Sequence, residues 1–407
     1  MKKLLSVLLA ALLILSCAAC AADPATPANS DPAATQTSTP EAPASEGKRD
    51  IVLGMNTYLT GEFAELGQAQ KQGAEIAIKH INEAGGVNGH MLKLIAYDDK
   101  ASTENDVQNI MRLIEEDHVD AICNCCLSAA VLATYEMTAE AKVIQVASTP
   151  SDLLTNLSPW VFRPIATYTV MNTQNVKNMG DMGYKTIGVM YANTETGLTS
   201  FEFMRDMLEQ DYGATVLGEV YNYGDTDYSS QFSKMINNGA ETIFLFMNTQ
   251  ELGLAFQQVR RLGFDGLLFG SESCCAPVVR EVGGDAANDV IYTTVNVIPD
   301  SIDDASTDLE RKFLTDYVAA YGELPRSDLA YRGYDQVLVL AEAFRNVDNI
   351  DDKDALRDSM QAVSGVTGLQ GTYDFTDGTG DGLSVSKVWA ISGGKNVLLE
   401  DYLAKKT

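Results

Sequence analysis

Polar side chains directly follow several apolar runs of this 407-residue chain, where they could contact a small ligand. Glu272 comes after the run Leu267–Gly270 and could neutralise a ligand ammonium inside a closed cleft, where an unpaired cation is costly. Ser128, at the start of a predicted helix, joins Ser148 and Thr149 in offering hydroxyls and a helix dipole to a ligand carboxylate. From the residues alone, a solvated loop carboxylate and ordinary cap and turn hydroxyls remain open alternatives.

These polar residues depend on a chain that alternates apolar runs with amphipathic helices. Residues 51–57 and 91–97 are predicted strands, and between them apolar residues recur at helical spacing over 74–81. A strand, a helix and a second strand make a right-handed crossover with parallel strands. The alternation continues to about residue 155 and restarts after 162–164. The pattern predicts an α/β protein with two doubly wound parallel-sheet lobes.

Two such lobes would enclose a cleft, because ligands of open parallel sheets bind beyond the carboxyl ends of the strands. The second lobe presents three further stretches at those ends, residues 193–197, 248–249 and 271–273. They bring hydroxyl, amide and carboxylate groups to the same edge. The sequence therefore predicts a polar ligand site between the lobes.

The opening unit also resembles a known family. A strand is followed by TG-x-x-A-x-x-G, a helix with G-A-x-x-A and I-N, then GG-V-NG and a strand ending in YDD. This string is similar to the start of branched-chain amino-acid-binding proteins, the extracytoplasmic receptors of ATP-driven amino-acid importers. The resemblance runs from Ile51 to about Ser392 and includes GSES at 270–273, GGDAA at 283–287 and AYRGYD at 330–335.

The resemblance implies the type I periplasmic-binding-protein architecture, in which the chain crosses between lobes three times. We place the three hinge crossings by analogy near Thr167, Val297 and Thr376. Lobe one is then expected at 50–167 plus 298–375, and lobe two at 168–297 plus 376–407. The family's site implies that the Ser128 turn and the Ser148-Thr149 segment hold the ligand headgroup. Glu272 would complete the ammonium site from the other lobe.

The chain departs from the family pattern at positions that would surround the ligand side chain. Leu66 and Thr196 stand where members carry aromatic residues, and Asn248 or Thr249 replaces another aromatic partner. Leu127 occupies the place of an expected serine, and the sequence leaves open whether Ser128 substitutes for it. Tyr331 either restores one aromatic wall or is a core tyrosine. These changes would enlarge the pocket or make it more polar, and they leave the identity of the amino acid open.

The first 20 residues predict an export signal, with Lys2-Lys3 as the charged start and an apolar run over 4–15. The segment ending in Cys20 resembles the lipobox of bacterial lipoproteins, where cleavage before a cysteine leaves it acylated. Cys17 is the second choice, and plain secretion is the alternative. Residues 21–49 lack an apolar period and are expected to form a disordered tether. No later run of about 20 apolar residues predicts a membrane span.

Composition excludes several other classes of protein. A net charge of −27 repels nucleic acid and anionic membranes. Three histidines provide little material for a metal site or a catalytic triad, so we expect no metal, no cofactor and no enzymatic activity. The odd number of cysteines after the signal favours small buried thiols, with one disulfide or a metal site as alternatives. These cysteines are Cys123, Cys125, Cys126, Cys274 and Cys275.

The sequence thus predicts a monomeric, lipid-anchored receptor outside the bacterial cell membrane, which captures a neutral or branched-chain amino acid and delivers it to the permease of an ABC importer. A receptor of the same fold that signals through a membrane partner is one alternative. An importer receptor for another small carboxylate or amide is a second. A thiol hydrolase is a third, though a Cys–His pair is poorly supplied.

Overall fold

The computed structural model describes residues 48–405. The predicted export signal, Cys17, Cys20 and nearly all of the predicted tether lie outside these residues. Among the described helices, none combines the length and the apolar character needed to cross a membrane.

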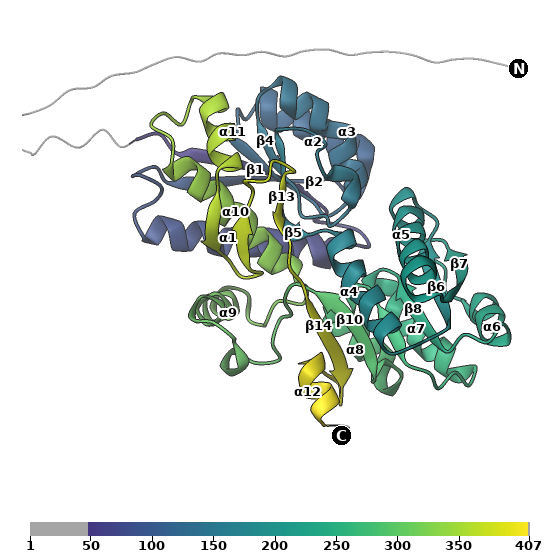
Figure 1. Ribbon diagram of the computed structural model, residues 1–407. Coiled ribbons are helices and arrows are strands. Elements are labelled where there is room, and N and C mark those ends of the chain that lie inside the picture. Colours follow the sequence, from purple (N-terminus) through teal and green to yellow (C-terminus); the bar gives the residue numbers. More distant parts are fainter. Residues whose placement is uncertain (1–47, 406–407) are drawn as a thin grey trace, which may run out of the picture. The chain divides into compact units, whose positions relative to one another are not determined.

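The first sheet has six strands in the order β13-β5-β4-β3-β1-β2, all paired in parallel. Its strands are β1 Ile51–Thr57, β2 Leu92–Asp98, β3 Ala121–Asn124, β4 Ile144–Val146, β5 Val161–Ala166 and β13 Asp381–Leu383. The helices of this half are α1 Ala64–Glu83, α2 Thr103–Glu115, α3 Ser128–Glu140, α9 Asp308–Tyr321, α10 Leu329–Arg345 and α11 Lys353–Gln361 (Figure 1). Strands β3, β4 and β5 are buried along their whole length, as parallel strands covered on both faces require.

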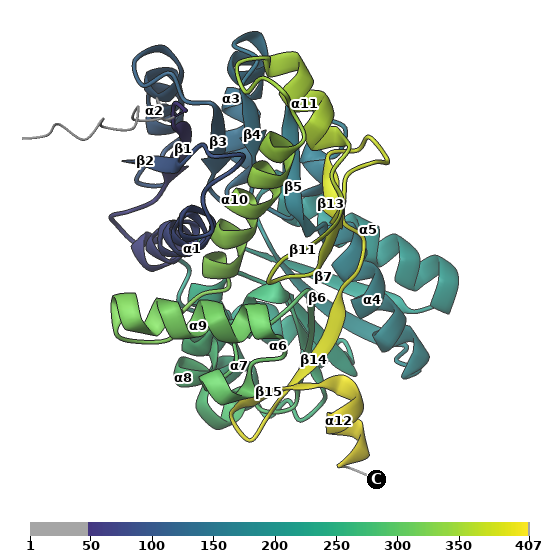
Figure 2. The same ribbon diagram turned by 90° about the vertical axis from the view of Figure 1, so that its left-hand side faces the viewer.

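Two glycines let α1 and α10 lie directly against each other (Figure 2). A Cβ atom on Gly333 would stand 1.9 Å from the carbonyl oxygen of Gln70, and one on Gly73 would stand 1.8 Å from that of Ala330. Neither position has room for a side chain. This contact fixes the rotation of α10, and with it the direction of the side chains that α10 carries.

The second sheet has seven strands in the order β15-β14-β10-β9-β8-β6-β7. Its strands are β6 Thr186–Ala192, β7 Thr215–Tyr221, β8 Thr242–Phe246, β9 Leu268–Gly270, β10 Val290–Thr294, β14 Lys387–Ser392 and β15 Lys395–Leu398. The helices of this half are α4 Tyr168–Asp181, α5 Glu195–Tyr212, α6 Ser229–Asn237, α7 Thr249–Arg261, α8 Pro277–Gly283 and α12 Leu399–Ala404. Strands β14 and β15 run antiparallel at one edge, so this sheet is mixed where the sequence predicts a parallel one.

The chain passes between the two sheets three times, as expected: between β5 and β6, after β10, and between β13 and β14. The third passage follows β13, because Asp381–Leu383 still pairs with β5 of the first sheet. That pairing lies beyond the crossing predicted near Thr376, and the lobe boundaries themselves stay a prediction. Strands β11 Ser364–Thr367 and β12 Thr372–Asp374 form a separate two-stranded hairpin.

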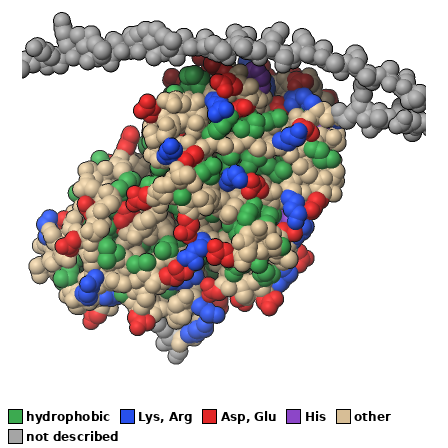
Figure 3. All heavy atoms as spheres, turned by 180° about the vertical axis from the view of Figure 1, so that it is seen from behind, with side chains coloured by type: hydrophobic (Ala, Val, Ile, Leu, Met, Phe, Trp, Pro, Cys, Tyr) green, Lys and Arg blue, Asp and Glu red, His purple; other side chains and the backbone are tan. Residues whose placement is uncertain are grey.

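Charged side chains of both signs are mixed over the surface. On the face in Figure 3, Lys and Arg side chains lie singly among Asp and Glu side chains, without a continuous basic patch. This face therefore offers no electrostatic footprint for a polyanion.

Candidate functional site

A small cavity lies at the carboxyl ends of β6, β8 and β9, where the parallel-sheet rule predicts a ligand. Three of the predicted site residues line it: Thr196, Asn248 and Glu272. Its volume of about 30 Å³ is comparable to the share of one water molecule in the liquid. An amino acid enters only if the walls move apart.

Glu272 is the charged residue of this cavity. It begins a 3₁₀ turn, Glu272–Cys275, two residues after β9, and its side chain is buried. The hydroxyl of Tyr168 donates a hydrogen bond of 3.3 Å to its Oε1. Burial raises the pKa of Glu272, while the positive charge of Arg332 acts in the opposite direction. A buried carboxylate of this kind is strongly stabilised by a cation brought into the cavity.

Aromatic residues form much of the remaining wall, although the sequence points to a loss of aromatic residues. Tyr168, Tyr221, Tyr223 and Phe246 all line the cavity. The rings of Tyr168 and Phe246 meet edge to face with centroids 4.9 Å apart. Sequence reasoning missed Tyr168 because it lies in a helix that was not predicted, and Tyr223 because it lies in a loop after β7.

Hydroxyls from the first-sheet half reach the cavity at Thr196. The Oγ1 atom of Thr196 lies 3.4 Å from Oγ of Ser128 and 3.2 Å from Oγ of Ser151. Ser128 is the first residue of α3, so it lies at the end of the helix that carries the positive end of the dipole. Ser151 was missed, although it belongs to the same Ser-Thr-Pro-Ser run as Ser148 and Thr149.

The side chains of Ser148 and Thr149 make hydrogen bonds within the first-sheet half. Ser148 Oγ lies within hydrogen-bonding distance of the Asn124 carbonyl and the Gln70 amide. Thr149 Oγ1 accepts a hydrogen bond from the backbone N–H of Ser151. Both residues therefore shape the segment that presents Ser151, and their own hydroxyls are engaged away from Thr196.

A buried arginine fixes the same segment from the other side. Arg163 donates to the carbonyl of Ser151, and its Nε donates to Asp381 Oδ1 at 2.7 Å. Asp381 belongs to β13, and its Oδ2 accepts a hydrogen bond of 2.8 Å from the hydroxyl of Thr155. Strand β13 thereby holds the Ser148–Ser151 segment through Arg163.

The two remaining predicted residues lie elsewhere. Leu66 packs in a small apolar cluster with Tyr58, Cys126 and Leu329 at the carboxyl ends of the first sheet. Tyr331 is fully buried in the core of the first-sheet half, and its hydroxyl donates to Glu310 Oε1 at 2.7 Å. For Tyr331 the structure favours the alternative that the sequence left open, a core tyrosine.

Arg332 is the charged residue that sequence reasoning passed over, although it lies within the AYRGYD motif. Its Nε and Nη2 donate to Asp328 Oδ2 at 2.8 and 2.6 Å, and its Nη1 donates to the Ser148 carbonyl at 2.9 Å. Burial disfavours the charge on Arg332, but Asp328, Cys126 and Glu272 together more than compensate, and the pKa of Arg332 is raised. The guanidinium stays charged beside the predicted ligand segment.

One cluster in the described part of the chain has the donor atoms for a metal ion. Atoms of Asp99, Asp106 and Cys125 lie within 4.8 Å of one another, and all three residues are buried. Burial, and then the neighbouring Asp99, raise the pKa of Asp106 to about 7. A proton held between the two carboxyls satisfies Asp99 Oδ2, which otherwise has no hydrogen-bond partner. The cluster therefore needs no metal ion.

The described cysteines give no sign of thiol catalysis. All five are free, and burial raises the pKa of each thiol. A raised pKa suppresses the thiolate, which is the nucleophilic form.

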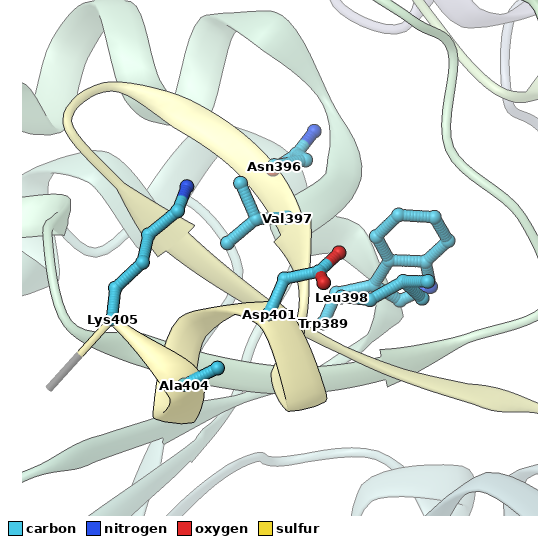
Figure 4. A pocket seen from close by; sticks show the side chains of 7 residues that line it. All are labelled: Trp389, Asn396, Val397, Leu398, Asp401, Ala404 and Lys405. Carbon is cyan, nitrogen blue, oxygen red and sulfur yellow. The ribbon is translucent and has the colours of Figure 1, made fainter. Parts of the chain in front are cut away.

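A larger groove of about 590 Å³ lies between the β14–β15 hairpin and α12. Figure 4 shows Trp389, Asp401 and Lys405 around it. The groove is at the sheet edge formed by β15, away from the carboxyl ends of the parallel strands. The cavity at Glu272 remains the candidate site because convergent polar groups and a buried charge meet there.

Comparison with known proteins gives a consistent family. A leucine-, isoleucine-, valine-, threonine- and alanine-binding protein of Pseudomonas aeruginosa is 24% identical over 304 residues, covering 74% of this chain and 79% of the relative. The crystal structure of a leucine-binding protein, LivK, from Thermotoga maritima matches with a TM-score of 0.76 at 23% identity, over 86% of this chain and 97% of the other. The substrate-binding protein LivJ of Streptococcus pneumoniae, solved with isoleucine, matches with a TM-score of 0.75 at 21% identity, over 85% and 97%.

The two structural matches confirm the fold, and the relatives confirm the resemblance to branched-chain amino-acid-binding proteins. The sequence profile of the periplasmic binding protein family matches residues 50–392, most of the chain. The protein therefore belongs to the periplasmic binding protein family, whose members are extracytoplasmic solute-binding proteins and not enzymes.

Proposed function

We propose that this protein is the lipid-anchored substrate-binding receptor of an ABC importer, and that it binds a neutral or branched-chain amino acid between its two lobes. The observation that carries the proposal is Glu272, a buried carboxylate in a cavity where hydroxyls of both halves meet. The names of the relatives, which include leucine, isoleucine, valine, threonine and alanine, support this class of ligand.

In this proposal the ligand joins the two halves through its charged headgroup. Its ammonium pairs with Glu272, and its carboxylate lies toward Ser128, Ser151 and the positive end of α3. Ser148 and Thr149 hold the segment in place, while Asn248 borders the ligand from the second-sheet half.

The mechanism is hinge opening and closure at the three passages between the sheets. The cavity is too small for an amino acid as it stands, so the ligand enters an open form. A ligand that contacts both halves binds the closed form more tightly and shifts the population toward it. The closed receptor then docks on the permease as a monomer.

Anchoring is proposed to occur through a lipid on Cys20, with Cys17 as the alternative. Mass spectrometry of the protein extracted from membranes tests this. A mature chain that begins at Cys20 and carries acyl groups is expected. An unmodified N-terminus produced by simple secretion would refute the anchor without affecting the ligand site.

The ligand site is tested by replacing Glu272 with glutamine and measuring amino-acid affinity by titration calorimetry. Removing the carboxylate leaves the ammonium unpaired and is expected to cost about 2–5 kcal/mol of binding free energy. Glu251→Gln is the matched control: Glu251 is also 8% exposed and belongs to the same half, but it does not line the cavity. Equal affinities in the Glu272→Gln and unaltered proteins would remove Glu272 from the site.

A further inference from the structure

Arg332 is a second buried charge near the cavity, of opposite sign to Glu272. The Gly333–Gln70 contact fixes α10 against α1, so the neighbouring Arg332 side chain has a defined direction. Its side chain is 6% exposed, and two hydrogen bonds to Oδ2 of Asp328 join it to a residue one helical turn away. The guanidinium is thus rigid and desolvated, which favours it over a flexible surface charge for binding an anion.

The hydrogen bonds of Arg332 leave part of its donor capacity for another acceptor. A guanidinium has five N–H groups, and the bonds to Asp328 and the Ser148 carbonyl engage three of them. One N–H remains on each of the two terminal nitrogens. Charged N–H donors of this kind form strong hydrogen bonds with a carboxylate.

Arg332 also lies on the cavity side of the first-sheet half. It bonds to the carbonyl of Ser148, and three residues later Ser151 contacts Thr196 in the cavity wall. Among the charges acting on Glu272, Arg332 is the leading favourable one. Within the described residues the ion pair of Arg332 is with Asp328, so its charge acts on Glu272 without a direct salt bridge between the two.

We propose that Arg332 is a specificity-determining residue that binds the carboxylate of the ligand, so that the site takes amino acids with a free carboxylate and rejects their amides and amines. This inference rests on the proposed function. A zwitterion completes an alternating row of charges: Asp328, Arg332, ligand carboxylate, ligand ammonium, Glu272. An amide has no carboxylate, so it leaves Arg332 without an anion to bind.

The test compares matched ligands on the purified full-length protein by titration calorimetry. The probes are leucine, isoleucine, valine, threonine and alanine, followed by the amide of whichever amino acid binds most tightly. The unaltered protein is expected to prefer the amino acid over its amide by about 100-fold or more, the effect of losing charge-assisted hydrogen bonds. Arg332→Gln should weaken the amino acid by about 30-fold or more and change the affinity of the amide by less than about threefold.

Two further variants keep the result interpretable. Arg332→Lys retains the charge without the planar fork and should give an intermediate preference, which also serves if Arg332→Gln fails to fold. Arg345→Gln is the control, because Arg345 lies on the same helix and pairs with Glu342 at the surface. It should leave both affinities unchanged.

The possible outcomes separate this inference from the proposed function. If amino acids bind but the Arg332 variants weaken the amino acid and its amide equally, the role of Arg332 is refuted and the receptor function stands. If the unaltered protein binds none of the five amino acids, the proposed function fails and the inference fails with it.

Discussion

Replacing Asp106 with asparagine is expected to change how the stability of this protein depends on pH. The pKa of Asp106 is raised to about 7, first by burial and then by the neighbouring Asp99 carboxylate. In the unfolded chain an aspartate titrates near pH 4. The folded protein therefore favours the protonated carboxyl, whose Oδ1 accepts a hydrogen bond of 2.6 Å from Asn56.

The size of the effect follows from the shift. A rise from about 4 to about 7 is about three pH units, and each unit corresponds to about 1.4 kcal/mol. The full value of about 4 kcal/mol applies to a group that titrates alone, so for a pair that shares its proton we expect about 2–4 kcal/mol. Because the folded pKa lies above the unfolded one, this stability is fully present below about pH 4 and is lost as the pH rises through about 7.

Urea unfolding at about pH 5 and about pH 9 measures the free energy of unfolding in both states of the pair. Asparagine mimics the protonated carboxyl: it accepts from Asn56 and can donate to Asp99. The Asp106→Asn variant should therefore exceed the unaltered protein by more near pH 9 than near pH 5, because only about one of the three pH units of stability is lost at pH 5. Equal losses of stability in the two proteins over this range would refute the shared proton.

Asp98, the residue before Asp99, provides a control because its pKa is shifted in the opposite direction. Burial alone would raise its pKa, but hydrogen bonds from the Thr60 hydroxyl and from the backbone N–H groups of Leu59 and Lys100 lower it. The charged form of Asp98 is thus the stabilising one. Asp98→Asn should lose stability above about pH 4, where Asp106→Asn does not.

Two further predictions concern packing and closure. Gly333→Ala should lower the free energy of unfolding, measured in urea, by about 1–3 kcal/mol, because its Cβ would meet the Gln70 carbonyl at 1.9 Å. Gly371→Ala is the control and should cost less, because its Cβ would meet only the flexible Leu383 side chain at 3.2 Å. Glu281→Gln should weaken ligand binding by less than about fivefold. It removes an exposed ion pair of 2.8 Å between Glu281, in α8 of the second-sheet half, and Arg326, which precedes α10. Calorimetry should detect the weaker binding at low salt, and the difference should vanish at about 0.5 M salt.

Most parallel strands of both sheets could be predicted from the sequence because they are short apolar runs followed by turn residues. Strands β5 and β13 could not, because β5 contains Arg163 and Pro164 and β13 is a three-residue strand in a stretch rich in glycine and aspartate. Helix α4 could not: Tyr168–Asp181 contains several asparagines and threonines, which have low intrinsic helix propensity. Its N-cap, the Thr167 hydroxyl accepting from Val170 N–H, and its buried face stabilise it in the folded protein.

In the site too, the residues that follow strands could be predicted and those placed by tertiary packing could not. Thr196, Asn248 and Glu272 could be placed together because each follows a strand of one sheet. Ser151 and Arg332 could not, because their position depends on how the Ser148–Ser151 segment and α10 pack against the rest of the first-sheet half. Tyr331 and Arg332 are adjacent in one helix, and only the rotation set by Gly333 and Gly73 decides which of them points into the core.

The contact of Arg163 with Asp381 has a consequence for the order of events after synthesis. The segment that carries Ser151 is held by a residue more than two hundred positions later, close to the end of the chain. A polypeptide still being threaded through an export channel lacks that clamp until its last portion emerges. The Ser148–Ser151 segment therefore takes its final position only once the last part of the chain has paired with β5.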